Sequence, residues 1–268
     1  MKYKFALAAT VLAISLAFAP GAHAGRSCES RPPSVQAIER GLALAEQTQR
    51  ALDGSGAQVV LLARAGQDLS KYGLRYSHFG FAYKAADAQG QPVWRVLHKL
   101  NQCGTADSAV YRQGLGEFFL DDLWRFEAAW SIPNPEAQQR LLALMQDERR
   151  AVSLNHKPYS VVSYVWSERY QQSNQWAIET LALAMDPNAT TRGRAQTWLQ
   201  ANGYQPTTLR LGPLTRLGAR ATAANVAFDD HPNEKRFSDR IETVTVDSVF
   251  SWAQRSGLGS APVALRLP

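Results

Sequence analysis

One strand of the predicted sheet reads Tyr76-Ser77-His78-Phe79-Gly80-Phe81-Ala82-Tyr83. Aromatic residues recur there at every second position, which is the period of a β-strand. One face is expected to carry Ser77, Phe79, Phe81 and Tyr83, and the other Tyr76, His78, Gly80 and Ala82. The second face surrounds His78 with small residues, which leaves space for another group to approach its imidazole.

A second strand is predicted over residues 92–100, with Trp94, Val96, His98 and Leu100 on one face. If the two strands form a hairpin with Lys84 opposite Pro92, His78 falls opposite His98, and directly opposed Cβ atoms lie roughly 4.5–5.5 Å apart. This register is an assumption, because a slip of one residue would put the two histidines on opposite faces. The alternative is two unrelated histidines, one of them packed under Trp94.

The first 24 residues have the features of an export signal. Lys2 and Lys4 form a basic start, residues 6–18 are an apolar run too short to span a bilayer comfortably, and Ala22-His23-Ala24 is a small-x-small cleavage site. We therefore expect residues 1–24 to be a signal peptide cleaved near Ala24. The mature protein, residues 25–268, is expected in the bacterial periplasm.

The charge of the chain is mild. The formal net charge of +6 falls to +4 when Lys2 and Lys4 leave with the signal, and no run of Lys or Arg exceeds two residues. Nucleic-acid binding is therefore not expected. No further apolar run is long enough for a transmembrane segment.

The mature chain contains two cysteines, Cys28 and Cys103. In an oxidising compartment two cysteines most simply form a disulfide, and closing a loop of about 75 residues contributes about 4 kcal/mol in the chain-entropy model. The alternative makes Cys103 a nucleophile, since it follows the His98 strand and precedes Gly104. A lone reactive thiol in the periplasm tends to be oxidised, which favours the disulfide.

The remaining segments indicate an α+β fold in which helices pack on an antiparallel sheet. Helices are predicted over 34–52, from Asn134-Pro135 to about 150, over 191–202 and from Asp247 to about 255, and strands over 57–64, 124–132 and 241–246. Residues 209–218 are predicted to be a turn-rich connection. We expect one domain over 25–268, with an N-terminal helix and a C-terminal extension.

A further helix is predicted to begin near Ser173, with Trp176 and Met185 on its buried side. The free N–H groups at a helix start can stabilise a developing oxyanion, which is the surrounding that a nucleophile needs. The alternative is simple capping, because serine is a favoured N-cap residue.

No cofactor or metal site is predicted. The run Asp229-Asp230-His231-Pro232-Asn233-Glu234 contains metal-ligand residue types, but adjacent ligands rarely converge without helical or strand spacing. A solvated turn is the favoured interpretation.

Four runs resemble an uncharacterised bacterial family, domain of unknown function 2145. They are residues 67–80 (QDLSKYGLRYSHFG), 101–105 (NQCGT), 114–122 (GLGEFFLDD) and 212–220 (GPLTRLGAR). The likeness covers almost the whole mature chain and implies no assigned activity.

The order of the two histidine strands and the later helix start is more distantly similar to circularly permuted papain-like proteins, of the NlpC peptidase and lecithin:retinol acyltransferase types. This resemblance implies a permuted papain-like architecture in which His78 is the base, His98 orients it and Ser173 occupies the nucleophile position. Those proteins have a cysteine there, and a serine hydroxyl needs stronger activation by its base than a thiol does.

Two functions follow from the resemblance. The first is a periplasmic hydrolase or acyltransferase acting on amide or ester bonds with a Ser-His-His site, on cell-wall peptide or lipid. The second is a non-catalytic envelope protein whose papain-like groove binds such a ligand. An enzyme needs the Ser173 hydroxyl within hydrogen-bond distance of a His78 ring nitrogen, whereas a binding protein needs only the groove. The sequence does not predict the oligomeric state.

Overall fold

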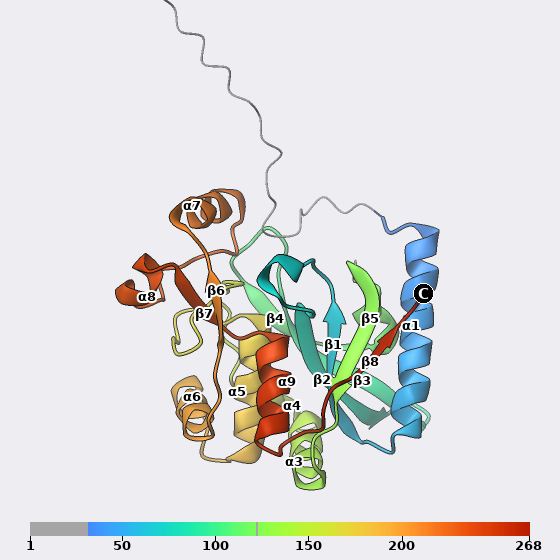
Figure 1. The fold of residues 1–268 in the computed structure, drawn as a ribbon. Coiled ribbons are helices and arrows are strands. Elements are labelled where there is room, and N and C mark those ends of the chain that lie inside the picture. The colour runs from blue at the N-terminus through green and yellow to red at the C-terminus, as the bar shows by residue number, and fades with distance from the viewer. Residues whose placement is uncertain (1–31, 122) are drawn as a thin grey trace, which may run out of the picture.

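The computed structural model describes residues 32–121 and 123–268. The predicted signal peptide and Cys28 lie outside this part. A six-stranded antiparallel sheet in the order β4-β3-β2-β1-β5-β8 forms the centre of the fold (Figure 1). Its strands are β1 (Val59–Ala65), β2 (His78–Ala86), β3 (Pro92–Asn101), β4 (Ser108–Gly114), β5 (Arg125–Ser131) and β8 (Val263–Arg266).

Helices cover both faces of this sheet, which confirms the predicted α+β class. α1 (Val35–Gly54) and α2 (Leu115–Phe119) pack on one face. The other face carries α3 (Pro135–Gln146), α5 (Ser173–Met185), α6 (Arg192–Ala201) and α9 (Val246–Arg255), with the short α4 (Glu148–Ala151) following α3. Figure 1 shows the sheet between α1 on one side and α5 and α9 on the other.

The alternation of residues along β2 assigns each side chain to one of these two layers. Phe79 and Phe81 belong to the core beneath α5, where the rings of Phe81 and Trp176 lie 6.1 Å apart. Ala82, which directly follows Phe81, belongs to the core under α1 and α2. Because successive side chains of a strand point to opposite faces, His78 shares the face of Ala82.

The N-terminal helix lies where the sequence predicts it, but several of its apolar residues are exposed. Ser34 caps α1 by accepting a hydrogen bond from the Ala37 amide at 3.1 Å. Val35 is nevertheless 72% exposed and Leu42 is 47% exposed, while Leu44 is fully buried. The buried positions of α1 begin at Gly41 and end at Leu52, so the apolar residues of its first turns remain outside the core.

The C-terminal part of the chain adds a small lobe built on a two-stranded sheet. β6 (Thr207–Arg210) pairs with β7 (Arg240–Thr243), and α7 (Pro213–Thr222) and α8 (Asn233–Phe237) lie between them in sequence. The turn-rich connection predicted over 209–218 is wrong, because Gly212 and Pro213 start a helix, as proline does at a first helical position. β7 also ends earlier than predicted, since Thr245 rather than Asp247 is the N-cap of α9.

The described helices include none that is both long enough and apolar enough to cross a bilayer.

Candidate functional site

The two predicted histidines meet, although the hairpin register differs from the expected one. Lys84 pairs with Trp94, and Pro92 pairs with Ala86. The turn is closed by the Asp87 amide bonding to the Gln91 carbonyl, with Gly90 at a positive φ of 77°, and this shifts the register by two residues. A shift of two preserves the face, so the His78 and His98 side chains still lie together, now as diagonal neighbours.

Gly80 on β2 leaves the space that the His98 side chain of β3 occupies. A Cβ atom at position 80 would lie 2.7 Å from both the His98 Cβ and the Leu97 carbonyl oxygen. Contacts that short do not occur without displacement of the backbone or of His98. Glycine at this position therefore allows the close approach of β2 and β3 at the imidazole pair.

Hydrogen bonds connect the two imidazoles to a third residue. His78 Nε2 lies 2.8 Å from His98 Nδ1, and His98 Nε2 lies 2.7 Å from the Gln113 Oε1 of β4. If the amide oxygen of Gln113 accepts from His98 Nε2–H, then His98 Nδ1 accepts from His78 Nε2–H. This tautomer assignment leaves His78 Nδ1 as the nitrogen with an unshared electron pair.

Both imidazoles are neutral near pH 7. Burial lowers the pKa of His98 to about 4, with the positive charge of Arg64 as a further cause. Burial, followed by the charges of Arg64 and His98, lowers the pKa of His78 well below its usual range. His98 is fully buried, whereas His78 is 9% exposed and forms the outer end of the chain.

The imidazole pair is walled by α2. The Phe118 ring lies 5.2 Å from the His98 ring and 6.0 Å from the His78 ring. The Arg64 guanidinium stacks over the same phenyl ring, donates to the Phe118 carbonyl and pairs with Asp121. Neither α2 nor β4 is among the elements predicted from the sequence. The role of Gln113 on β4, and that of Arg64, whose partner Phe118 lies on α2, are therefore missed.

Ser173 lies in the other layer of the fold. It is the first residue of α5, which packs on the face opposite to the imidazoles, and its N-cap is Gln172. The Ser173 Oγ is 3.4 Å from the Tyr159 hydroxyl, and within the described residues it makes no hydrogen bond to either histidine. The structure thus brings together His78 and His98 but does not join Ser173 to them.

The first turn of α5 is instead fixed to the backbone beside His78. The Asn174 side chain accepts a hydrogen bond from the Phe79 amide at 3.2 Å and donates to the Ser77 carbonyl at 3.3 Å. The start of α5 is therefore attached to the start of β2, although Ser173 and His78 belong to different layers.

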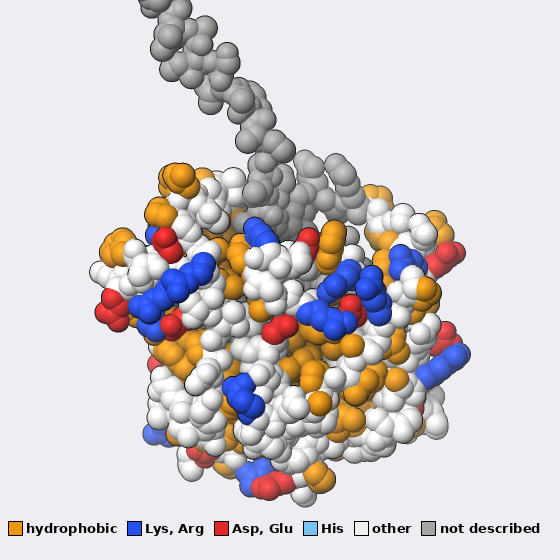
Figure 2. Space-filling model, in the orientation of Figure 1, with side chains coloured by type: hydrophobic (Ala, Val, Ile, Leu, Met, Phe, Trp, Pro, Cys, Tyr) orange, Lys and Arg blue, Asp and Glu red, His pale blue; other side chains and the backbone are white. Residues whose placement is uncertain are grey.

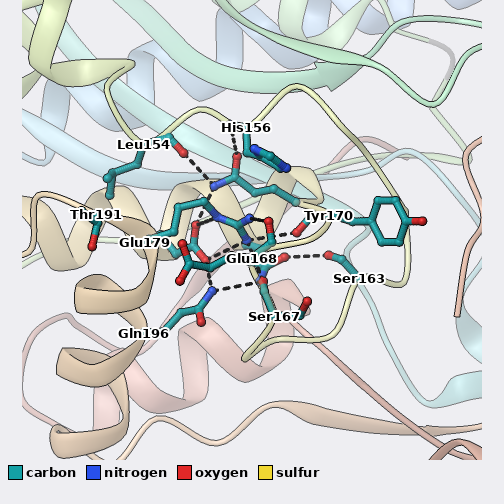
Figure 3. Close-up of polar contacts among 12 residues, drawn as sticks. Leu154, His156, Ser163, Ser167, Glu168, Tyr170, Glu179, Thr191 and Gln196 are labelled. Carbon is teal, nitrogen blue, oxygen red and sulfur yellow. Dashed lines mark hydrogen bonds and ion pairs between the residues drawn. The ribbon is translucent and has the colours of Figure 1, made fainter. Parts of the chain in front are cut away.

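A buried polar network holds α5 in this position (Figure 3). Glu179 of α5 is fully buried and accepts hydrogen bonds from Arg192 at 2.9 Å, Gln196 at 2.8 Å and Gln171 at 2.5 Å. Arg192 also donates to the carbonyls of Ser167, Glu168 and Tyr170. These bonds fasten the irregular segment 152–172 to α5 and α6. The network therefore fixes the position of the N-terminus of α5, where Ser173 lies.

Lys99 belongs to the same network. Its Nζ donates to the Gln171 Oε1 and the His156 carbonyl, both at 2.6 Å. Burial is the first cause that lowers its pKa, to about 7, followed by the charge of Arg192. The burial of Lys99 is explained by these two hydrogen bonds, which attach β3 to segment 152–172.

Residues 229–231 form a turn, as predicted, but Asp230 and His231 are not solvated. The side chains of His231 and Asp230 are both fully buried, with His231 Nδ1 3.0 Å from Asp230 Oδ1. Asp230 Oδ2 accepts a hydrogen bond from the Tyr164 amide at 2.7 Å. This turn therefore attaches segment 152–172 to the C-terminal lobe.

A hollow of about 300 Å³ opens beside the start of β2. It is lined by Arg75, Tyr76, Asp247, Phe250, Ser251, Gln254, Pro262 and Ala264. Behind its wall the buried Glu127 accepts hydrogen bonds from Arg75 Nε at 2.5 Å and from the Tyr76 hydroxyl at 2.7 Å. Burial, followed by the bond to Glu127, raises the pKa of Tyr76, so this phenol remains protonated. Sequence patterns do not reveal this hollow, because Asp247 is 172 residues from Arg75.

The cysteine predictions rest on one residue inside the described part and one outside it. Cys103 follows β3, and no free cysteine occurs among the described residues. The alternative of a Cys103 nucleophile therefore loses its support. Because Cys28 lies outside that part, the Cys28–Cys103 disulfide stays a prediction.

Comparisons with known proteins agree with the resemblance seen in the sequence. No curated protein and no solved structure matches the chain, so the permuted papain-like architecture also stays a prediction. Residues 51–253, most of the chain, match the family described as "Uncharacterized protein conserved in bacteria (DUF2145)". The chain is a member of that family.

Proposed function

We propose that the protein is an exported envelope protein that binds a small charged ligand and does not transform it at Ser173. The observation that carries this proposal is the separation of the expected catalytic groups into two layers. A nucleophile must lie within hydrogen-bond reach of its base. Ser173 has Tyr159 as its neighbour at 3.4 Å, while the His78 ring bonds to His98 on the opposite face.

The hollow beside β2 is the binding site of this proposal. Ligand sites are concave and combine apolar walls with a few polar groups that fix orientation, and about 300 Å³ is the lower end of their usual volume. Phe250 and Pro262 supply apolar wall, and Arg75 and Asp247 supply opposite charges. Arg75 bonds to Glu127 through Nε. Within the described residues its two terminal guanidinium nitrogens make no hydrogen bond, so they can bind a ligand.

These charges favour a ligand that carries both a carboxylate and an ammonium group. A carboxylate matches the planar fork of the Arg75 guanidinium. The Asp247 carboxylate accepts long hydrogen bonds of 3.3 Å from the Arg75 amide. Burial raises its pKa, although the backbone amides of Arg75, Tyr76 and Asp247 oppose that shift. An ammonium group of the ligand would stabilise the ionised form of this carboxyl. The end of a cell-wall peptide has both groups and is the ligand class that we propose.

A second hollow of about 280 Å³ is less suited to such a ligand. Its charged groups, Glu136 and Arg140, bind each other at 2.7 Å, and Arg140 also donates to the Met185 carbonyl. A ligand would have to break these contacts before it gained its own.

Calorimetric titration of the mature protein with the cell-wall tripeptide L-alanyl-D-γ-glutamyl-meso-diaminopimelate tests the proposal. We expect saturable binding that Asp247→Asn weakens about tenfold or more, since a hydrogen bond to a charged group contributes about 1.5–3 kcal/mol. Glu46→Gln, an exposed carboxylate on α1, is the matched control and should bind like the wild type. No heat at millimolar peptide, or equal binding by the Asp247→Asn variant, would contradict the proposed site.

The hydrolase remains the second candidate, and one observation favours it. The chain from Gln113 through His98 orients His78 so that Nδ1 can accept a proton, as a general base must. In this candidate Ser173 would have to reach His78 from the other layer. Its reactivity is therefore the point at which the two functions differ.

A further inference from the structure

α7 presents its apolar face to solvent. Leu214, Leu217 and Ala221 follow helical spacing on one side, and Leu214 is 84% exposed and Leu217 66% exposed. Ala219, on the opposite side, and Ala223, directly after the helix, pack on the core of the C-terminal lobe. A surface helix normally turns its larger apolar residues toward the core, so α7 has the inverse of the usual arrangement.

α8 adds a large exposed ring to the same lobe. Phe237 is 71% exposed, with the Arg236 guanidinium 4.9 Å from its ring centroid. Arg216 of α7 bonds to Asp239, which follows α8, and this contact ties the two helices to each other. In Figure 2 hydrophobic side chains accordingly lie on the outer surface over α7 and α8, at the upper left.

The lobe also carries three exposed arginines on the elements next to these apolar side chains. Arg210 and Arg240 are exposed and directly opposite each other where β6 and β7 meet the two helices. Like charges in this position are destabilising. Within the described residues neither Arg210, Arg240 nor the exposed Arg220 of α7 forms an ion pair. An anionic partner would supply the missing charge.

We propose that α7 and α8 form a docking surface for an anionic lipid membrane. Leu214, Leu217 and Phe237 insert at the boundary of headgroups and acyl chains, while Arg210, Arg220 and Arg240 contact lipid phosphates. The combination of protruding apolar side chains and surrounding arginines is typical of elements that lie in the membrane interface. Nucleic acid would satisfy the arginines but leave the leucines in water. This surface is separate from the hollow at Arg75, so the proposal does not depend on the ligand proposed there.

Vesicle flotation of the mature protein tests the proposal. The probes are vesicles of phosphatidylethanolamine and phosphatidylglycerol at three to one, and vesicles of phosphatidylcholine alone. The wild type should float with the anionic vesicles, and raising the salt concentration should weaken binding by screening the arginines. Leu214→Gln/Leu217→Gln and Arg210→Gln/Arg240→Gln should each lower the bound fraction about tenfold. Val35→Gln on α1, a similarly exposed apolar residue, is the matched control and should bind like the wild type.

Two further readouts distinguish a lipid-binding surface from a damaged fold and from a dimer interface. The thermal midpoint of the leucine double variant should equal that of the wild type, and that of the arginine double variant should rise because a like-charge pair is removed. Equal flotation with phosphatidylcholine vesicles, or unchanged flotation of the leucine double variant, would overturn the proposal. So would sedimentation analysis in which the wild type is a dimer, the leucine double variant is a monomer and neither floats, because the face would then bind a second copy.

Discussion

His78 Nε2 lies 2.8 Å from His98 Nδ1 even though the strand register places His98 opposite Gly80. The two imidazoles are diagonal neighbours on the face covered by α2, and Gln113 continues their hydrogen-bonded chain on β4. This geometry depends on a residue without a side chain at position 80.

Gly80→Ala should therefore destabilise the protein. The added Cβ would lie 2.7 Å from His98 Cβ and from the Leu97 carbonyl, and overpacking of this kind costs about 1–3 kcal/mol. Urea unfolding measures the loss. Gly54→Ala is the control, since no atom lies within 4 Å of the new Cβ and alanine is favoured in a helix by about 0.5–1 kcal/mol. Equal stability of the two variants would show that β2 and β3 do not approach as described.

The imidazole pair should make stability depend on pH. The unfolded histidines bind protons below pH 6.5, whereas the folded pKa of His98 is about 4 and that of His78 is also lowered. Their contribution is thus fully present above pH 6.5 and is lost as the pH falls toward the folded values. When the pH is lowered from 7.5 to 5, the unfolding free energy of the wild type should fall. That of the His98→Gln variant should fall by about 1–2 kcal/mol less. Parallel losses in the two proteins would contradict the lowered pKa of His98.

Glu179 should be far more important for stability than a carboxylate in a surface pair. Glu179→Ala leaves the buried Arg192 without its counter-charge, and breaking a buried pair costs about 3–5 kcal/mol. Glu46→Ala removes an exposed partner of Arg50 and should cost less than about 0.5 kcal/mol. For a chain of this length 1 kcal/mol corresponds to about 2–4 °C in thermal midpoint, so calorimetry resolves the difference. Similar midpoints for the two variants would mean that the network does not fasten segment 152–172.

Cys28 and Cys103 should be linked in protein recovered from the periplasm. The proposed export would bring both thiols into an oxidising compartment, and the closed loop would restrict the unfolded chain. Mass spectrometry of non-reduced tryptic peptides should find the linked pair. Complete alkylation of both cysteines in freshly isolated, unreduced material is the result that would refute the disulfide.

Local chemistry is enough to predict part of this structure. The period of two in β2 and β3 correctly assigns His78 and His98 to one face, and the Asn134-Pro135 start of α3 is correct because cap and proline act within one turn. The exact register is not predictable, because it depends on how residues 87–91 close the turn. β4 and β8 are missed, since their short, mixed sequences become strands only by pairing with neighbours.

The candidate site is less predictable than the strands. The expected role of Ser173 comes from sequence order, and order does not specify on which face of a sheet a helix packs. The hollow at Arg75 and Asp247 and the network at Glu179 join residues far apart in the chain. Such sites form only through tertiary packing, so periodicity and short motifs carry no signal for them.

The reactivity of Ser173 decides between a binding protein and a hydrolase. A fluorophosphonate probe labels a serine whose hydroxyl gives its proton to a neighbouring base, and intact-mass spectrometry of the mature protein detects the adduct. We predict that Ser173 stays unlabelled, because its neighbour is Tyr159 and the His78 ring lies on the other face of the sheet. Labelling of Ser173 that is abolished equally by Ser173→Ala and by His78→Ala would contradict the binding-protein proposal and establish a catalytic pair.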